Sequence, residues 1–215
     1  MAAVDAQIYL IRHGETAWSL SGQHTGRTDL PLTEHGEQQA RQLGELLHSV
    51  RFSQILVSPL RRALRTCELA GFGAAARIEQ NLSEWNYGDY EGLTPAQIRS
   101  QRPGWDVYRD GCPGGEAAEQ VAARADRVIA ELRTMQGRAA LFSHGQFLRA
   151  LAVRWIELPI GQGYHLGLDT GSLSILGYEH NNVEAPAILL WNAVSNDLFE
   201  LTSRPASSVV DRSAS

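Results

Sequence analysis

One local pattern occurs three times in this chain: a short apolar run, a polar loop and a stretch with helical periodicity. The apolar runs cover residues 7–12, 54–57 and 139–142, and turn-forming residues follow each of them. Short runs of this kind indicate buried β-strands. Strands that alternate with helices pair in parallel. The pattern therefore predicts an α/β fold with a mostly parallel central sheet, helices on both faces and three α/β/α layers.

The helices that accompany these runs carry start and stop signals. Thr33 stands at the N-cap position of a predicted helix over residues 33–48, which has leucines on one face. A second predicted helix starts near Pro59, where the missing N–H group of proline costs nothing. A third covers residues 117–135 and ends before Gly137. These signals support helical crossovers between parallel strands.

The C-terminal part of the chain predicts a different pairing. Residues 172–178 and 187–191 look like two late strands, and the turn-prone segment 179–184 between them predicts a hairpin or an edge pair. The length of 215 residues and the 43% hydrophobic content favour one domain, which we place at residues 1–202. Residues 203–215 are rich in Ser, Ala and Pro, and we expect them to form a disordered tail.

The distribution of apolar residues and cysteines bears on the compartment. No apolar stretch approaches the ~20 residues that cross a bilayer. Residues 1–7 contain no basic residue and no apolar run, unlike a secretory signal. Cys67 and Cys112 are too few and too far apart for a disulfide framework or a zinc-ligand cluster. We therefore expect a cytoplasmic protein with no membrane partner.

The charge balance limits the class of ligand. The net charge of -5 argues against a broad nucleic-acid surface, because binding a phosphate backbone requires many clustered cations. All cationic side chains other than histidine are arginines, and Arg61, Arg62 and Arg65 lie close together. The planar guanidinium fork suits bidentate phosphate contact, although the absence of lysine also fits coding bias.

Polar residues follow all three predicted strands. They are Arg12-His13-Gly14, Ser58 with Arg61 and Arg62, and Ser143-His144-Gly145. Ligands of parallel sheets bind beyond the carboxyl ends of the strands, so we expect these groups to meet there. Each signal alone also fits an ordinary turn or helix start. Together, two histidines, several arginines and flexible glycines predict an anion pocket.

The segments that carry these residues resemble a known family. LIRHGET at residues 10–16 is similar to the signature of the histidine phosphatase superfamily, which also contains the cofactor-dependent phosphoglycerate mutases. The resemblance extends over residues 8–190 and includes four further segments: HTGRTDLPLT (24–33), SPLRRALRT (58–66), LSEWNYGDYEG (82–92) and SHG (143–145). It implies a phosphoglycerate mutase-like fold, with His13 as the phosphorylated nucleophile. By the same resemblance, Arg12, Arg62 and His144 form the phosphate pocket, and Glu84 donates a proton.

These roles are chemically consistent. His13 must attack phosphorus through a neutral nitrogen, and the charges of Arg12 and Arg62 lower its pKa. Those arginines and a protonated His144 would stabilise the transferring phosphoryl group, so we expect neither a metal nor a cofactor. Glu84 would protonate the leaving alkoxide and later deprotonate the attacking water, which predicts a mildly acidic pH optimum.

Other residues have weaker support. Thr25 and Gly26 match a phosphate-contacting pair of the family, and Gly14 and Gly145 would offer loop N–H groups to the phosphate. We expect Ser19, Gln23 and His24 to line the entrance, unless they form an ordinary surface loop. Tyr87 would shape the substrate mouth or pack in the core. Arg109 would bind a second anionic group of the substrate or lie solvated on the surface.

Within the family, EWNYGDYEG and RDGC resemble the sedoheptulose-bisphosphatase and acid-phosphatase members. This favours hydrolysis of small phosphorylated metabolites, such as sugar phosphates or bisphosphates. A mutase remains an alternative, although the mutases usually follow the proton donor with an RHYG-like string and use a lysine that this chain lacks. A non-catalytic phosphate-binding module is a second alternative. An exposed edge strand or helix face could also support a homodimer.

Overall fold

The computed structural model describes residues 6–194, and a six-stranded sheet organises this part of the chain. The strand order across the sheet is β3-β2-β4-β1-β5-β6. The strand bounds are β1 (Gln7–Arg12), β2 (Gln54–Val57), β3 (Arg77–Ile78), β4 (Arg138–Ser143), β5 (Leu173–Tyr178) and β6 (Pro186–Ala193). The three strands expected at the βα units are present with nearly the expected bounds.

The central part of the sheet is parallel. β1 pairs in parallel with β4, β4 with β2, and β2 with β3. β5 runs antiparallel to β1, and β6 antiparallel to β5, so the predicted C-terminal pair is a hairpin at one edge. Because β1, β2 and β4 point the same way, the loops after them meet at one edge of the sheet, and Arg12 stands opposite Ser143 in the register.

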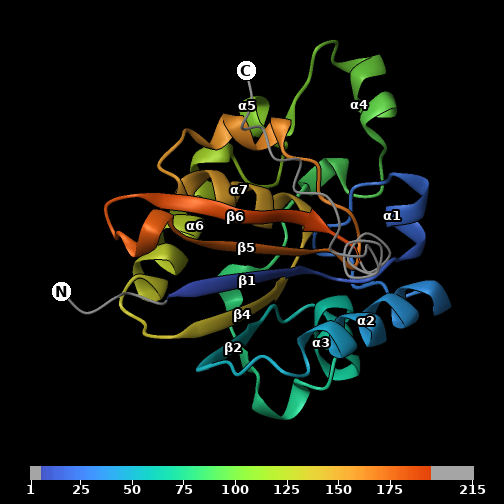
Figure 1. The fold of residues 1–215 in the computed structure, drawn as a ribbon. Coiled ribbons are helices and arrows are strands. Elements are labelled where there is room, and N and C mark those ends of the chain that lie inside the picture. Colours follow the sequence, from blue (N-terminus) through green and yellow to red (C-terminus); the bar gives the residue numbers. More distant parts are fainter. Residues whose placement is uncertain (1–5, 195–215) are drawn as a thin grey trace, which may run out of the picture.

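Helices cover both faces, as predicted. On one face, α2 (Glu34–Leu47) packs with α3 (Arg61–Leu69), and on the other α6 (Ala118–Leu132) packs with α7 (Gly145–Trp155). The alternation of side chains along each strand supplies both cores. In β1, Ile8 and Leu10 belong to the cluster with α6 and α7, whereas Tyr9 and Ile11 belong to the cluster with α2 and α3. Figure 1 shows these helix pairs and the end of β1 near α1 (Ala17–Ser21).

The helix starts agree with the sequence signals in part. Thr33 is the N-cap of α2, where its side chain accepts from the N–H of Gly36. Pro59, in contrast, lies outside its helix, because α3 begins at Arg61 with Leu60 as N-cap. Gly137 has a φ of +80° before β4, a conformation that favours glycine.

A long irregular segment between β3 and α6 was not assigned from the sequence. It contains only short elements, which lack the length for a clear hydrophobic period: η2 (Gln80–Leu82), η3 (Gly88–Tyr90), α4 (Pro95–Gln101) and α5 (Val107–Asp110). Figure 1 shows α4 and α5 beyond the sheet, away from α2 and α3. Three more short helices are η1 (Gly73–Ala75), η4 (Ile160–His165) and η5 (Glu179–Asn181). We call residues 79–117 the insertion.

The two ends of the chain limit what the structure tests. The predicted tail at residues 203–215 and the domain boundary at residue 202 lie outside the described residues. Within residues 6–194, no helix has the length and apolar character that a membrane crossing requires.

Candidate active site

His13 follows β1 directly and is almost completely buried. Its Nδ1 atom lies 2.7 Å from the carbonyl oxygen of Gly14. A carbonyl only accepts hydrogen bonds, so Nδ1 carries the proton and Nε2 keeps a lone pair. Burial, followed by the charges of Arg62 and Arg12, holds the pKa of His13 well below its ordinary value. The imidazole is therefore neutral, with a nucleophilic Nε2.

His144 is the second buried histidine, and its ring centroid lies 5.1 Å from that of His13. The Nε–H of Arg62 donates to His144 Nδ1 at 3.1 Å, and His144 Nε2 lies 2.7 Å from Ser58 Oγ. Burial and then the charge of Arg62 hold the pKa of His144 well below its ordinary value. The expectation of a protonated His144 is therefore wrong for this pocket. Its neutral ring carries its proton on Nε2.

Arg62 is completely buried, and most of its donors contact protein atoms. Nη1 donates to the carbonyl of Thr28, and Nη2 to those of Thr25 and Gly26, at 2.9 to 3.0 Å. With Nε bonded to His144, these contacts leave one Nη1 N–H group without an acceptor among the described residues. Arg62 thus fixes the loop over residues 25–28 and offers at most one donor to a ligand.

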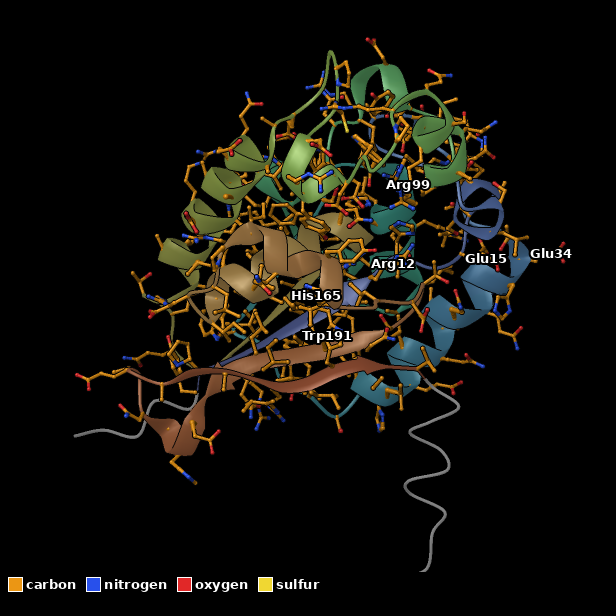
Figure 2. The ribbon with its side chains drawn as sticks, turned by 90° about the horizontal axis from the view of Figure 1, so that it is seen from above. Arg12, Glu15, Glu34, Arg99, His165 and Trp191 are labelled. Atoms are coloured by element: carbon orange, nitrogen blue, oxygen red, sulfur yellow. The ribbon has the colours of Figure 1, made fainter. Side chains whose placement is uncertain are left out.

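Arg12 is the more open guanidinium. Nη1 donates to the carbonyl of Leu168, whereas the buried Nε has no hydrogen-bond partner in residues 6–194. A Cβ atom at Gly145 would lie 3.3 Å from both Cζ and Nε of Arg12, so the glycine leaves space for the guanidinium against α7. Figure 2 shows Arg12 in the middle of the view, between the segments that carry Arg99 and His165.

Glu84 comes from the insertion and is mostly buried. Its Oε1 atom accepts from the N–H groups of Trp85 and Phe147, at 2.8 and 2.9 Å, and Oε2 accepts from Gln146 at 3.0 Å. Two of these donors belong to the first turn of α7, where a helix favours negative charge. The carboxyl group is thus fixed at the end of the helix that follows His144.

One cavity of about 200 Å³ brings most of the predicted residues together. Its lining includes, from the sequence predictions, Arg12, His13, Ser19, Gln23, His24, Thr25, Glu84, Tyr87 and Gly145. Arg62 and His144 stand behind this lining, completely buried, in contact with each other. Since the cavity is smaller than the pockets that hold drug-sized ligands, its size suits a small polar molecule.

Two predicted phosphate contacts are not open to a ligand. The N–H of Gly14 donates to Thr66 Oγ1, and its carbonyl contacts His13. The N–H of Gly26 donates to Glu91 Oε1 at 2.7 Å, and its carbonyl accepts from Arg62. The expected N–H contact from Gly14 is therefore wrong, and the N–H of Gly26, of the expected phosphate-contacting pair, also already has a protein acceptor.

Of the two alternatives for Arg109, the structure supports the surface position and not the contact with the substrate. Its side chain is exposed, pairs with Asp110 at 2.7 Å and donates to the carbonyl of Gly104. It lines a separate depression of about 390 Å³ together with Arg99 and His165. Local pairing with the neighbouring aspartate holds Arg109 away from the cavity of His13.

Arg149 was missed by the sequence reasoning. It lines the cavity from α7, and its guanidinium donates to the carbonyls of Gly163 and Tyr164 and to the Gln146 side chain. The signal was available, because Arg149 lies four residues after Gly145 and so shares its helix face. The cavity therefore has a second cationic group besides Arg12.

The cavity mouth is aromatic. The ring of His24 stacks on Tyr87, with centroids 4.4 Å apart, and its buried Nε2 has no partner in the described part of the chain. Burial and the charge of Arg99 lower the pKa of His24 to about 4, so the ring is neutral. Tyr87 is buried in the core and also lines the cavity, so its packing is confirmed and its contact with the substrate stays a prediction.

Within residues 6–194, no group of three or more His, Cys, Asp or Glu side chains is arranged to hold a metal ion.

Comparison with known proteins identifies the family. Residues 8–193 match the model of the histidine phosphatase superfamily, branch 1. The chain belongs to the histidine phosphatase superfamily. It has the superfamily's fold, and it is an enzyme of the phosphatase class.

Three curated relatives and one solved structure show the range of the family. The chain is 44% identical over 184 residues to an acid phosphatase of Mycobacterium tuberculosis, covering 84% of this chain and 90% of the relative. It is 32% identical over 255 residues to sedoheptulose 1,7-bisphosphatase of Saccharomyces cerevisiae (88% and 94%). It is 34% identical over 185 residues to a probable phosphoglycerate mutase of Salmonella choleraesuis (81% and 86%). A solved Mycobacterium tuberculosis structure superposes with a TM-score of 0.84 at 39% identity, covering 89% of this chain and 99% of that one.

Proposed function

We propose that this histidine phosphatase hydrolyses phosphate monoesters of small metabolites, in particular sugar phosphates or bisphosphates, through a phosphohistidine at His13 and without a metal ion. The contact between His13 Nδ1 and the Gly14 carbonyl carries the proposal. It leaves the Nε2 lone pair in a cavity that also holds the Arg12 guanidinium and the Glu84 carboxyl group.

In the first step, His13 Nε2 attacks phosphorus, a P–N bond forms, and the P–O bond to the leaving group breaks. The guanidinium of Arg12, which lines the cavity, and the remaining Nη1 N–H of Arg62 would donate to the phosphoryl oxygens, whereas the Nε2–H of His144 is held by Ser58 Oγ behind the lining. A protonated Glu84 gives its proton to the departing alkoxide, which would otherwise leave poorly.

In the second step, a water molecule attacks phosphorus and the P–N bond breaks. Glu84 accepts the proton from the water, inorganic phosphate is released, and neutral His13 is restored. A nucleophile that stays neutral in mild acid supports the mildly acidic pH optimum expected from the sequence, which remains a prediction.

The size and charge of the cavity support the substrate class. Arg149 offers a second cationic group beside Arg12, so a substrate with two anionic groups would be held at both. The similarity to a sedoheptulose 1,7-bisphosphatase supports such a substrate. Arg149 takes the place that the sequence reasoning gave to Arg109.

A phosphometabolite panel tests the proposal. It includes sedoheptulose 1,7-bisphosphate, fructose 1,6-bisphosphate, 3-phosphoglycerate and phosphoserine, assayed at several pH values with a metal chelator. We expect phosphate release with a preference for bisphosphates, and an acid-labile phosphoenzyme after rapid quenching. Loss of activity in the chelator, or failure to trap the phosphoenzyme during turnover, would contradict the proposal.

Phosphoglycerate mutation is the second candidate, favoured by the similarity to the probable mutase. The residues after Glu84 do not support it, because Trp85-Asn86-Tyr87-Gly88 replaces the RHYG-like string and the chain has no lysine. Interconversion of 2- and 3-phosphoglycerate primed by bisphosphoglycerate, faster than phosphate release, would establish mutase activity instead.

A further inference from the structure

Arg124 of α6 lies outside the cavity lining, yet its hydrogen bonds surround the Glu84 segment. The guanidinium has five N–H donors, and the structure gives each an acceptor. Nε and Nη2 bind the two carboxylate oxygens of Glu116, at 2.8 and 2.9 Å. Nη1 donates to the carbonyls of Asn81 and Ser83, at 2.7 and 2.9 Å, and Nη2 also to that of Glu84, at 3.4 Å. No donor remains for a substrate.

Glu116 extends this support to the other side of Glu84. Its Oε2 atom accepts from the N–H of Asn86 at 2.9 Å, and its carbonyl accepts from Trp85 Nε1, also at 2.9 Å. Its own N–H donates to the carbonyl of Asn86 at 2.8 Å. The Arg124–Glu116 pair therefore holds the backbone both before and after Glu84.

The same guanidinium also contacts the helix that binds the Glu84 carboxyl group. Its Cζ atom lies 4.7 Å from the centroid of the Phe147 ring, and the N–H of Phe147 donates to Glu84 Oε1. A cation over an aromatic face is attracted to it. Arg124 thus joins the backbone of Glu84 to the helix end that orients its side chain.

We propose that Arg124 is a positioning residue for proton transfer by Glu84, acting through the backbone at residues 81–86 and through α7. The inference rests on the proposed function, in which Glu84 protonates the leaving group. General acid catalysis requires the donor within hydrogen-bond reach of the leaving oxygen, and a small displacement costs much of the rate. Lysine keeps the charge at this position but cannot reach five acceptors in a fixed plane.

The dependence of the rate on the leaving group separates positioning from a general structural role. An alkoxide needs a proton as it leaves, whereas p-nitrophenolate leaves without one. The quantity to compare is kcat/KM, which reports on the steps up to formation of the phosphohistidine. In R124K we expect kcat/KM for fructose 1,6-bisphosphate to fall about 10- to 100-fold, and that for p-nitrophenyl phosphate to fall less than about 3-fold.

Arg154 offers a matched control. Like Arg124, Arg154 forms two hydrogen bonds with one carboxylate. Its partner is Asp126 of α6, at 2.9 and 3.1 Å, and the pair lies on the surface. R154K should leave the ratio of the two kcat/KM values unchanged. Equal losses for both substrates in R124K would overturn the positioning role. If R124K fails to fold, E116Q tests the same network, and equal losses there would overturn the role as well.

E84Q distinguishes this inference from the proposed function. If E84Q loses activity selectively toward the sugar bisphosphate and R124K does not, the positioning role is wrong and the role of Glu84 stands. If E84Q shows no selectivity for the leaving group, the proton-donor role of Glu84 itself is wrong.

Discussion

The cavity has two halves that are built differently. One half comes from the residues after β1, β2 and β4, where His13, Arg62 and His144 are buried and bonded to backbone or to one another. The other half comes from the insertion, where Glu84 and Tyr87 lie on irregular backbone that side chains such as Arg124 hold in place. The sheet therefore fixes the proposed nucleophile, whereas the insertion shapes the opposite wall of the cavity.

Replacement of His13 is expected to have the largest effect, and it tests whether the nucleophile lies in the strand-end half of the cavity. H13A should lower kcat/KM at least about 10⁴-fold for every substrate, because the nucleophile is gone. Phosphate release from p-nitrophenyl phosphate and from fructose 1,6-bisphosphate measures this. H165A, which changes an exposed histidine outside the cavity, is the control. Residual turnover near wild-type would show that another group attacks phosphorus.

Replacing Arg149 is expected to give the next largest effect, because this residue of α7 lines the cavity and is proposed to bind a second anionic group. R149M should raise KM for a bisphosphate about 10- to 100-fold, which is the loss of one charged hydrogen-bonded contact. For p-nitrophenyl phosphate, KM should change little. Initial-rate kinetics with both substrates measure the difference. Equal changes would mean that Arg149 supports the fold of α7 and η4 rather than a second anionic group.

The pH dependence of stability tests the burial of three histidines. In the folded chain, His13, His24 and His144 have a depressed pKa, whereas in the unfolded chain they protonate near 6.5. Below about pH 6.5 the unfolded state binds more protons, so the free energy of unfolding should fall by about 1.4 kcal/mol per pH unit for each histidine. The decline continues until the folded-state pKa is reached, and above about pH 6.5 this contribution is fully present.

Urea denaturation between pH 5 and 7 measures this slope. H144Q should reduce the slope by the share of one histidine. If the slope of H144Q equals that of the wild type, His144 is protonated in the folded wild-type chain and the inference of a depressed pKa is wrong.

The smallest expected effect concerns Arg109 of the insertion. R109A should change kcat/KM for bisphosphates less than about 2-fold, because surface ion pairs contribute little and this one lies outside the cavity. The same bisphosphate assay used for R149M measures it. A large rise in KM would mean that Arg109 of the insertion binds the second anionic group of the substrate.

The strand-end half was predictable and the insertion half only partly so. His13, Ser58 and His144 each follow a buried strand, and parallel pairing brings such positions together whatever their separation in the chain. Glu84 was named by resemblance alone. Its support by Arg124 and Glu116 depends on tertiary contacts between α6 and the irregular insertion, which no hydrophobic periodicity of the sequence indicates. The four-residue spacing of Gly145 and Arg149 was visible in the sequence, but Arg109 and Arg149 could not be ranked without knowing that Asp110 pairs with Arg109.

The backbone of His13 has a consequence for when the enzyme becomes active. Its N–H donates to the carbonyl of Ser143, and its carbonyl accepts from the N–H of Gly171. The backbone of His13 is thus hydrogen-bonded on both sides to segments that are synthesised much later. A nascent chain lacks the first hydrogen bond until Ser143 has emerged from the ribosome, and it lacks the second until Gly171 has emerged. Catalytic competence is then expected only after the chain has been synthesised through Gly171, and activity can serve as a readout of folding up to this segment.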